Sequence, residues 1–254
     1  MSILEEIIKY KQKELDGLST LSALLTSEVS NASVSFTDAI TRSRVGIIAE
    51  IKKKSLSAGD LAGDQDLVTK AQSYGDAGAD ALSVVTEDKY FGGSVQLFQE
   101  IRNVTTLPML MKDFIIHPSQ VLQAEQSGAD AILVIAALRK YFHPDLLSTL
   151  AASSITPVIE VATIDELSFP CVQRAEVIGV NARDLNTFQV NIDRACSIIK
   201  KISKNTTAIA FSGVNSRSDI KRYKGAGAVA VLVGEKLMRA KDVTSVIHEL
   251  KYEN

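Results

Sequence analysis

Eight short apolar runs recur along this chain and constrain its fold more than any other feature. They are apolar nearly throughout, which is typical of parallel strands that are covered on both faces. Stretches with the composition of helices lie between most of them. The apolar runs occupy residues 45–51, 81–86, 109–112, 131–136, 157–161, 177–181, 207–211 and 229–234, and the main helical stretches occupy 66–77, 95–104, 119–127, 144–152, 192–202 and 217–224.

The spacing of these units selects the architecture. A strand and its helix take up roughly 20 to 35 residues, as in repeated βα units, and eight such units favour a closed barrel. Several helices end in a glycine signature such as Gly78-Ala79-Asp80-Ala81, where glycine supplies the left-handed conformation that ends a helix. A doubly wound open sheet competes, but no Gly-x-Gly-x-x-Gly follows the first strand. We therefore predict the α/β class with a (β/α)8 TIM barrel.

The region before the first strand has a helical pattern. Apolar residues spaced among lysines and glutamates predict an amphipathic helix from residue 3 to about residue 30. Ser35 is a candidate N-cap of a second, short helix that ends near Arg44. Because barrels reach 254 residues with a single core, we expect one domain over residues 1–254, with residues 1–44 as an N-terminal helical extension.

Composition excludes several classes of function. A net charge of -2 offers no electrostatic attraction for nucleic acid or a membrane surface, and no apolar run reaches the roughly 18 residues of a membrane helix. No signal peptide pattern begins the chain, which predicts a cytoplasmic protein. Cys171 and Cys196 are therefore not expected to form a disulfide, and the three histidines lack metal-ligand spacing, so we expect no metal.

Polar and charged residues follow the predicted strands. They include Glu50 and Lys52, Thr86 and Glu87, Lys112 and Asp113, Glu160, Asn181 and Arg183, Ser212 and Gly213, and Gly234. In a barrel the carboxyl ends of the strands converge on one pocket, where a lysine and a carboxylate can act as general acid and general base. A single pair could be a structural ion pair at a wet strand end, but charges on five strands favour an active site.

The last two strands are followed by a different kind of loop. Ser212-Gly213-Val214-Asn215 and Val233-Gly234-Glu235 carry glycines that expose backbone N–H groups. Barrels often bind phosphate at these two loops. Either loop alone could be a simple turn, whereas the two together predict a phosphate site.

These residues resemble the indole-3-glycerol phosphate synthase family over about residues 35 to 250. The motifs that carry the resemblance are Ile47-Ile48-Ala49-Glu50-Ile51-Lys52 with Ser55-x-Ser57, Thr86-Glu87-x3-Phe91-x-Gly93-Ser94, Leu110-Met111-Lys112-Asp113-Phe114-Ile115-Ile116, Ile159-Glu160-Val161, Gly179-Val180-Asn181-x-Arg183-Asp184-Leu185, Ser212-Gly213 and Val233-Gly234-Glu235-x-Leu237-Met238. The resemblance implies a barrel lyase of tryptophan biosynthesis. Such an enzyme converts 1-(2-carboxyphenylamino)-1-deoxyribulose 5-phosphate into indole-3-glycerol phosphate, carbon dioxide and water without a cofactor.

The resemblance also implies roles for individual residues. Lys112 would be the general acid in ring closure, and Glu160 the general base in dehydration. Lys52 would contact the substrate carboxylate while Glu50 holds it charged, and a share of the acid role stays open for Lys52. Asn181 would orient the substrate. The substrate-binding residues that it implies are Ser55, Phe91, Phe114, Leu133, Arg183, Leu185, Phe211, Ser212, Gly213, Gly234 and Glu235. We expect a monomer whose partner is a small phosphorylated substrate, and a pathway-enzyme partner stays open.

The chain departs from the family pattern at two places. Phe211 stands where the family usually has a glutamate, and phenylalanine can neither accept a proton nor a hydrogen bond. Leu56 and Ala58 stand where the family usually has proline and lysine. A weakly active or inactive barrel that binds the phosphorylated substrate or a pathway partner is therefore the alternative. Another phosphate-binding barrel, such as a sugar-phosphate isomerase, would not explain the ordered motifs.

Overall fold

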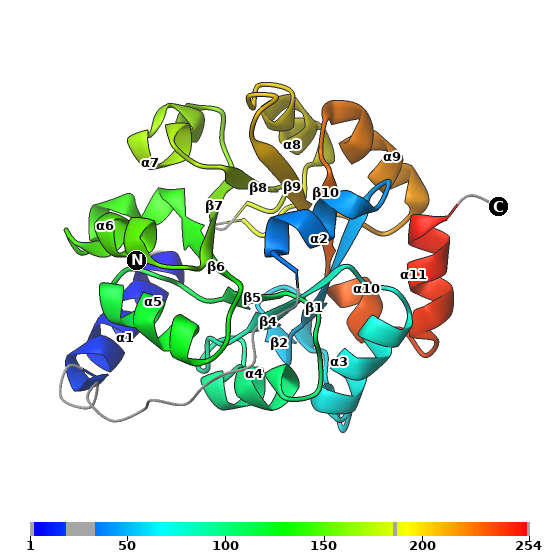
Figure 1. The fold of residues 1–254 in the computed structure, drawn as a ribbon, viewed down its shortest axis with the longest axis horizontal. Helices are drawn as coiled ribbons and strands as arrows, with labels where there is room; N and C mark the ends of the chain where they lie inside the picture. Colours follow the sequence, from blue (N-terminus) through cyan, green and yellow to red (C-terminus); the bar gives the residue numbers. More distant parts are fainter. Residues whose placement is uncertain (1–2, 19–33, 185–186, 253–254) are drawn as a thin grey trace.

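The computed structural model describes residues 3–18, 34–184 and 187–252. In this part of the chain, eight parallel strands close into a barrel in the order β1-β10-β9-β8-β7-β6-β5-β4, and helices surround it (Figure 1). The strands are β1 (Gly46–Ile51), β4 (Ala81–Val85), β5 (Met109–Lys112), β6 (Ala131–Ile135), β7 (Thr156–Val161), β8 (Val177–Asn181), β9 (Thr207–Phe211) and β10 (Ala230–Val233). The predicted (β/α)8 barrel is confirmed, and each predicted strand agrees to within one residue at either end.

Several of the helices around the barrel begin at side-chain caps. Asp66, Ser94, Asn191 and Ser216 each accept a hydrogen bond from a backbone N–H of the first helical turn. The helices that correspond to the predicted helical stretches are α3 (Leu67–Asp76), α4 (Val95–Arg102), α5 (Pro118–Gln126), α6 (Leu146–Ala152), α8 (Ile192–Ile199) and α9 (Arg217–Ala226). The sequence did not predict η1 (Ala136–Tyr141), η2 (Asp165–Ser168), α7 (Pro170–Gln173), α10 (Glu235–Met238), α11 (Val243–Lys251) or the hairpin of β2 (Lys54–Ser55) and β3 (Gly59–Asp60).

Two apolar layers hold the barrel together. Alternate strand residues such as Ile47, Ala49 and Ile51 point outward and pack against the surrounding helices. Residues such as Ile48 and Leu110 point inward and fill the barrel. Both faces of each strand are therefore buried, which explains why the strands are apolar nearly throughout.

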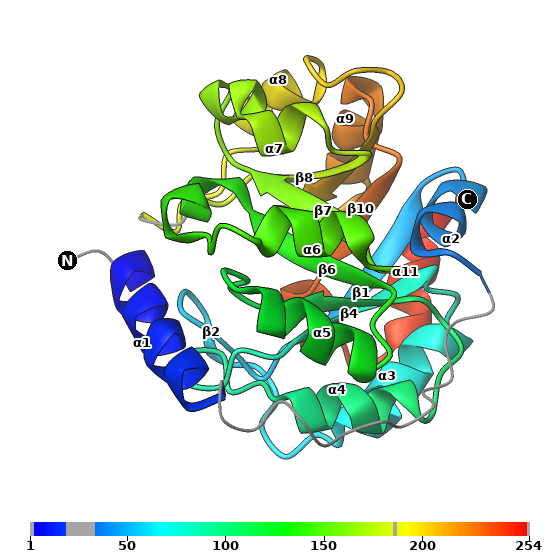
Figure 2. The same cartoon turned by 60° about the vertical axis from the view of Figure 1, so that its left-hand side comes forward.

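The N-terminal helices lie at opposite ends of the barrel (Figure 2). Helix α1 (Ile3–Leu18) lies at the carboxyl ends of the strands, where Ile3, Leu4 and Ile7 line a pocket. Helix α2 (Phe36–Arg42) closes the other end, where its buried residue Ile40 belongs to the same apolar cluster as the barrel interior.

The sequence prediction for this region can be compared in part. The predicted cap is confirmed, because the hydroxyl of Ser35 accepts a hydrogen bond from the backbone N–H of Asp38 at 3.1 Å. The first helix is described from Ile3 to Leu18, and the rest of the predicted helix, from residue 19 to about residue 30, lies outside the described residues. Among the described helices, none combines the length and apolarity needed to cross a membrane.

Candidate active site

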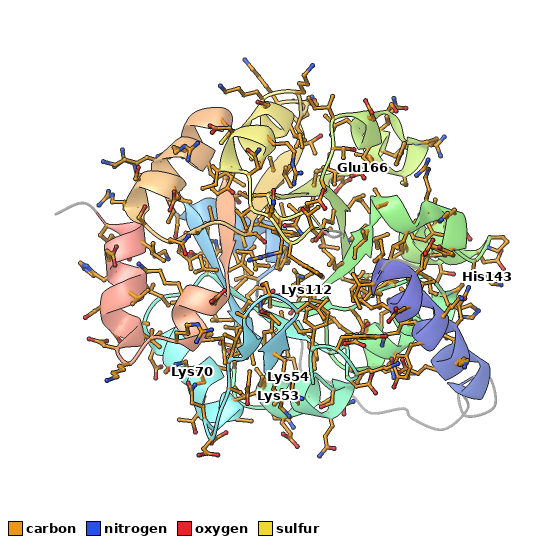
Figure 3. The ribbon with its side chains drawn as sticks, turned by 180° about the vertical axis from the view of Figure 1, so that it is seen from behind. Lys53, Lys54, Lys70, Lys112, His143 and Glu166 are labelled. Carbon is orange, nitrogen blue, oxygen red and sulfur yellow. The ribbon has the colours of Figure 1, made fainter. Side chains whose placement is uncertain are left out.

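Four inward-facing residues form one layer at the carboxyl end of the barrel. Glu50, Lys112, Glu160 and Phe211 come from β1, β5, β7 and β9, which are alternate strands of the closed sheet. Neighbouring strands are displaced by about one residue in such a barrel, and the observed register places these four residues at the same height. Layers of four side chains from alternate strands are typical of this fold. Here three of the four are charged, and Lys112 lies near the middle of the ring of strands (Figure 3).

Glu50 is the buried counter-ion of two lysines. Its carboxylate accepts a hydrogen bond from the Lys52 ammonium at 2.7 Å, and the Lys112 ammonium lies 3.9 Å from its other oxygen. Burial disfavours the charged form of Glu50, but Lys52 and Lys112 outweigh this effect and hold the pKa of the carboxyl below its usual 4.5. Glu50 and Lys52 both line one pocket.

Glu160 lies at the end of a hydrogen-bonded chain. The Ser212 hydroxyl donates to the amide oxygen of Asn181 at 3.0 Å, and the Asn181 amide nitrogen donates to Glu160 at 3.1 Å. The backbone N–H of Arg183 also donates to the Asn181 oxygen, which fixes the orientation of that amide. The second oxygen of Glu160 is buried without a hydrogen-bond partner. Burial raises the pKa of Glu160 above its usual 4.5, against the opposing effects of Lys112 and Asn181.

Phe211 fills the fourth place in the layer. Its side chain is 1% exposed, and its ring lies over Gly179, where a Cβ atom would come within 2.4 Å of two ring carbons. The ring thus occupies the space that the missing side chain of Gly179 leaves in the barrel. No proton can be exchanged at this position, so Glu50 and Glu160 are the carboxylates of the layer.

A pocket of about 330 Å³ opens above this layer. The predicted site residues that line it are Glu50, Lys52, Ser55, Phe91, Lys112, Phe114, Leu133, Glu160, Asn181, Arg183, Phe211, Ser212, Gly213, Gly234 and Glu235. The structure therefore brings together all the predicted site residues except Leu185, which lies outside the described residues. Phe91 and Phe114 form one apolar wall, with their ring centroids 6.2 Å apart.

The pocket is also lined by the cations Arg183 and Lys236 and by the glycine loops after β9 and β10. Arg183 donates to the Ser57 hydroxyl at 3.2 Å and to the carbonyl of Phe188, which joins the loop after β8 to the loop after β1. The side chain of Glu235 pairs with Arg239 at 3.1 Å, and Arg239 is not among the residues that line the pocket. This arrangement of Arg183 and the glycine loops can hold an anion without a metal.

Two residues at the pocket have strained backbones. Phe188 and Ser212 have φ angles of 59° and 66°, and they are the non-glycine residues with positive φ among those that the structure describes. Such conformations disfavour residues with a side chain and persist where the surrounding structure enforces them, often at functional sites. For Ser212, the Tyr223 hydroxyl holds the carbonyl at 2.9 Å.

Comparison with known proteins identifies the family. The family model described as "Indole-3-glycerol phosphate synthase" matches residues 4–250. The chain belongs to the indole-3-glycerol phosphate synthase family. Curated indole-3-glycerol phosphate synthases from Staphylococcus aureus strains USA300 / TCH1516 and USA300 are each 37% identical over 261 residues, which cover 100% of this chain and 98% of theirs. The resemblance that the sequence motifs indicated is therefore confirmed.

A solved structure gives an independent comparison of the fold. The thiamine phosphate pyrophosphorylase of Pyrococcus furiosus superposes with a TM-score of 0.60 at 14% identity, over 82% of this chain and 95% of that one. At this low identity the similarity concerns the barrel alone.

Sequence reasoning missed several residues of the synthase-family pocket. Ile3, Leu4 and Ile7 of α1 line it, and so do Leu56 and Phe188. The amphipathic pattern of the N-terminal segment was visible, but it did not show which surface the apolar face covers. The positive φ of Phe188 had no local signal, because aromatic residues rarely adopt that conformation.

Proposed function

We propose that this protein is an active indole-3-glycerol phosphate synthase, and therefore a carbon–carbon lyase of the carboxy-lyase type. Its substrate is 1-(2-carboxyphenylamino)-1-deoxyribulose 5-phosphate, and its products are indole-3-glycerol phosphate, carbon dioxide and water. The observation that carries the proposal is that the family match spans residues 4–250 while Lys112 and Glu160 share one layer beneath the pocket. The monomeric state and the cytoplasmic location stay predictions.

Ring closure requires a proton at the ketone oxygen of the substrate. The ring carbon that bears the carboxylate attacks the ketone carbon, and the Lys112 ammonium protonates the oxygen so that it becomes a hydroxyl. Loss of carbon dioxide then restores the aromatic ring. Lys52 binds the substrate carboxylate before it leaves, and Glu50 holds Lys52 at 2.7 Å.

Dehydration completes the indole ring. After ring closure the neutral Lys112 amine takes up a proton from solvent. The new hydroxyl then leaves as water with this second proton from Lys112, and Glu160 removes a proton from the adjacent carbon to form the double bond. The burial of Glu160 supports this role, because a raised pKa brings its proton affinity closer to that of a base working near neutral pH. Asn181 holds the Glu160 carboxyl in place through its amide.

The two sides of the pocket match the two ends of the substrate. The apolar wall of Phe91, Phe114 and Leu133 accommodates the anthranilate ring, and the family resemblance adds Leu185 as a proposed contact of that ring. Ser55 and the backbone at Gly213, Gly234 and Glu235 hold the phosphate, with Ser212 and Arg183 nearby. This division would bend the substrate so that its reacting carbons meet above Lys112.

A fluorescence assay tests this function. The chain contains no tryptophan, so indole formation can be followed without a background of protein tryptophan after the purified protein is mixed with the substrate. We expect rapid growth of the signal, with a loss of roughly 10²- to 10⁴-fold in Lys112→Ala because a general acid contributes about this factor. Lys204 is exposed, and Lys204→Ala is the matched control that should keep full turnover. Equal turnover in the Lys112 variant would refute its role.

Phe211 favours a second candidate function. With phenylalanine in the layer of Glu50, Lys112 and Glu160, the barrel would bind the phosphorylated substrate or a pathway partner with little or no turnover. Substrate binding without product at enzyme concentrations near that of the substrate would support this alternative. If Phe211→Glu then produced turnover, the missing carboxylate would be its cause, whereas a fast unaltered enzyme would exclude the alternative.

A further inference from the structure

Lys11 is a buried lysine on the helix that covers the pocket. It is 3% exposed, and its ammonium lies 3.0 Å from an Asp113 carboxylate oxygen and 2.9 Å from Glu14. Burial lowers the pKa of a lysine, but Asp113 and Glu14 outweigh this effect and raise the pKa of Lys11 above its usual 10.5. The residue is therefore a charged ammonium inside the protein.

Burying this ion pair costs more free energy than attaching a helix requires. An apolar residue of similar volume often stabilises a buried position as well as an ion pair does, because a charge loses its hydration when it is buried. Ile7 and Ile8 of the same helix are 2% and 1% exposed and already hold α1 by apolar contact. The additional effect of the Lys11 ion pair is to fix the place of Asp113.

Asp113 is held on every side. One carboxylate oxygen accepts the backbone N–H of Phe114 at 2.7 Å, and the other accepts the Thr86 hydroxyl at 2.7 Å. Lys11 reaches both of these oxygens, at 3.0 and 3.2 Å. The ion pair thus locks the turn by which the chain leaves β5.

The residues on either side of Asp113 both face the pocket. Lys112 precedes it as the proposed general acid, and Phe114 follows it in the apolar wall. The helix that carries Lys11 also covers this pocket through Ile3 and Ile7. One ion pair therefore connects the helix that covers the pocket to the turn directly after the proposed acid, Lys112, at the end of β5.

We propose that Lys11 is a positioning residue for catalysis. It acts through Asp113 to hold Lys112 and Phe114 in fixed positions relative to α1. It touches no substrate in this arrangement. The inference rests on the proposed function, because the position of Lys112 matters only if Lys112 transfers a proton. Small displacements of a reacting group cost rate more than they cost binding, so the effect should appear mainly in kcat.

The first test separates kcat from KM in charge variants of α1. Lys11→Met should lower kcat about 10-fold or more, with KM within about 3-fold, because a misplacement of about 1 Å can cost as much as 10²-fold in rate. Lys11→Arg keeps the charge and should restore most of kcat. Lys13→Met is the matched control, since Lys13 is exposed on the same helix. A Lys11→Met enzyme with unchanged kcat, or an equal loss in Lys13→Met, would overturn the inference.

A double-variant cycle tests the route through Asp113. Asp113→Asn should lower kcat as Lys11→Met does, and the double variant should be no slower than the slower single variant, because both changes break one connection. Losses that multiply would show independent effects and overturn the inference. A structural readout accompanies the cycle: amide exchange at Phe114 should accelerate in Lys11→Met and stay unchanged in Lys13→Met.

The outcome for the unaltered protein separates the two proposals. Turnover that Lys11→Met leaves intact would refute the positioning role alone. No turnover in the unaltered protein would refute the proposed function and, with it, the positioning of an acid.

Discussion

A methyl group added at Gly179 should destabilise the barrel through Phe211. The new Cβ would lie 2.4 Å from the Cε2 and Cζ atoms of the Phe211 ring, whereas ordinary contacts are 3.4–4 Å. Gly179 does not have a positive φ, so its backbone accepts alanine without strain. The whole penalty of Gly179→Ala therefore comes from the displaced ring.

The magnitude follows from the burial of that ring. Phe211 is 1% exposed and borders the pocket on one side, while the rest of the barrel interior restricts the movement of its ring. Overpacking of this kind costs about 1–3 kcal/mol. For a protein of this length each kcal/mol lowers Tm by roughly 2–4 °C, which predicts a Tm lower by about 2–12 °C.

Urea and thermal unfolding of a double-variant cycle measure this contact. Phe211→Leu removes the two colliding ring atoms at a cost of roughly 3 kcal/mol or less, and Gly179→Ala should then cost little when added to it. Gly225→Ala is the matched control, because nothing lies within 4 Å of its new Cβ and alanine favours a helix by up to about 1 kcal/mol. If the costs of Gly179→Ala and Phe211→Leu simply add, the contact between the ring and Gly179 is not the cause.

Three further predictions concern protonation. If Glu160 is the base, kcat/KM should fall as pH drops through its raised pKa, on an acid limb above the usual 4.5, and Glu160→Gln should remove both that limb and roughly 10²-fold or more of turnover. Because Lys52 lowers the pKa of Glu50 despite its burial, the ion pairs of Glu50 should stabilise the fold above pH 4.5. This stabilisation should be lost as pH falls through the lowered pKa. The free energy of unfolding of Glu50→Gln, measured in urea, should lack this dependence on pH. Burial, with a smaller effect of His143, lowers the pKa of His117 below 6.5, so the unfolded chain binds a proton better than the folded one. The free energy of unfolding should therefore fall as pH drops below 6.5. His117→Asn keeps a helix cap, and the difference between its unfolding free energies at pH 5.5 and 7.5 should be smaller.

The barrel and the charges of its site were predictable because both depend on local patterns. A strand buried on both faces must be apolar, so a charge at its carboxyl end, such as Lys112 after Met109–Met111 or Glu160 after Val158-Ile159, stands out. A closed barrel brings the carboxyl ends of its strands to one face, so these charges could be assigned to one site before any distance between them was known. The pairing of Glu50 with Lys52 was predictable for the same reason, since the two are close in sequence.

The place of the N-terminal helices was not predictable in this way. An amphipathic pattern tells which face of a helix is buried, but not which distant surface buries it. Lys11 did carry a signal, because it follows Ile7 by one helical turn and so lies on the apolar face, where a lysine needs a partner. Its partner Asp113 is 102 residues away, and only the folded chain identifies it.

The layer geometry was also beyond the pattern of the sequence. Phe211 is an ordinary apolar residue at the end of an apolar strand, and nothing local shows that it shares a layer with Glu50. That arrangement depends on the stagger between strands, which is a property of the closed sheet.

Because β1 pairs with β10, the barrel cannot close during synthesis until its last strand has left the ribosome. Gly46 pairs with Ala230, so at about 5–20 residues per second the first strand waits roughly 10 to 40 s for the second of its two neighbours to be synthesised. During that interval the nascent chain carries an open sheet edge that could pair with other chains. The pocket needs Glu50 from the first strand of the sheet and Gly234 after its last strand, so it is complete only after the last strand has been synthesised.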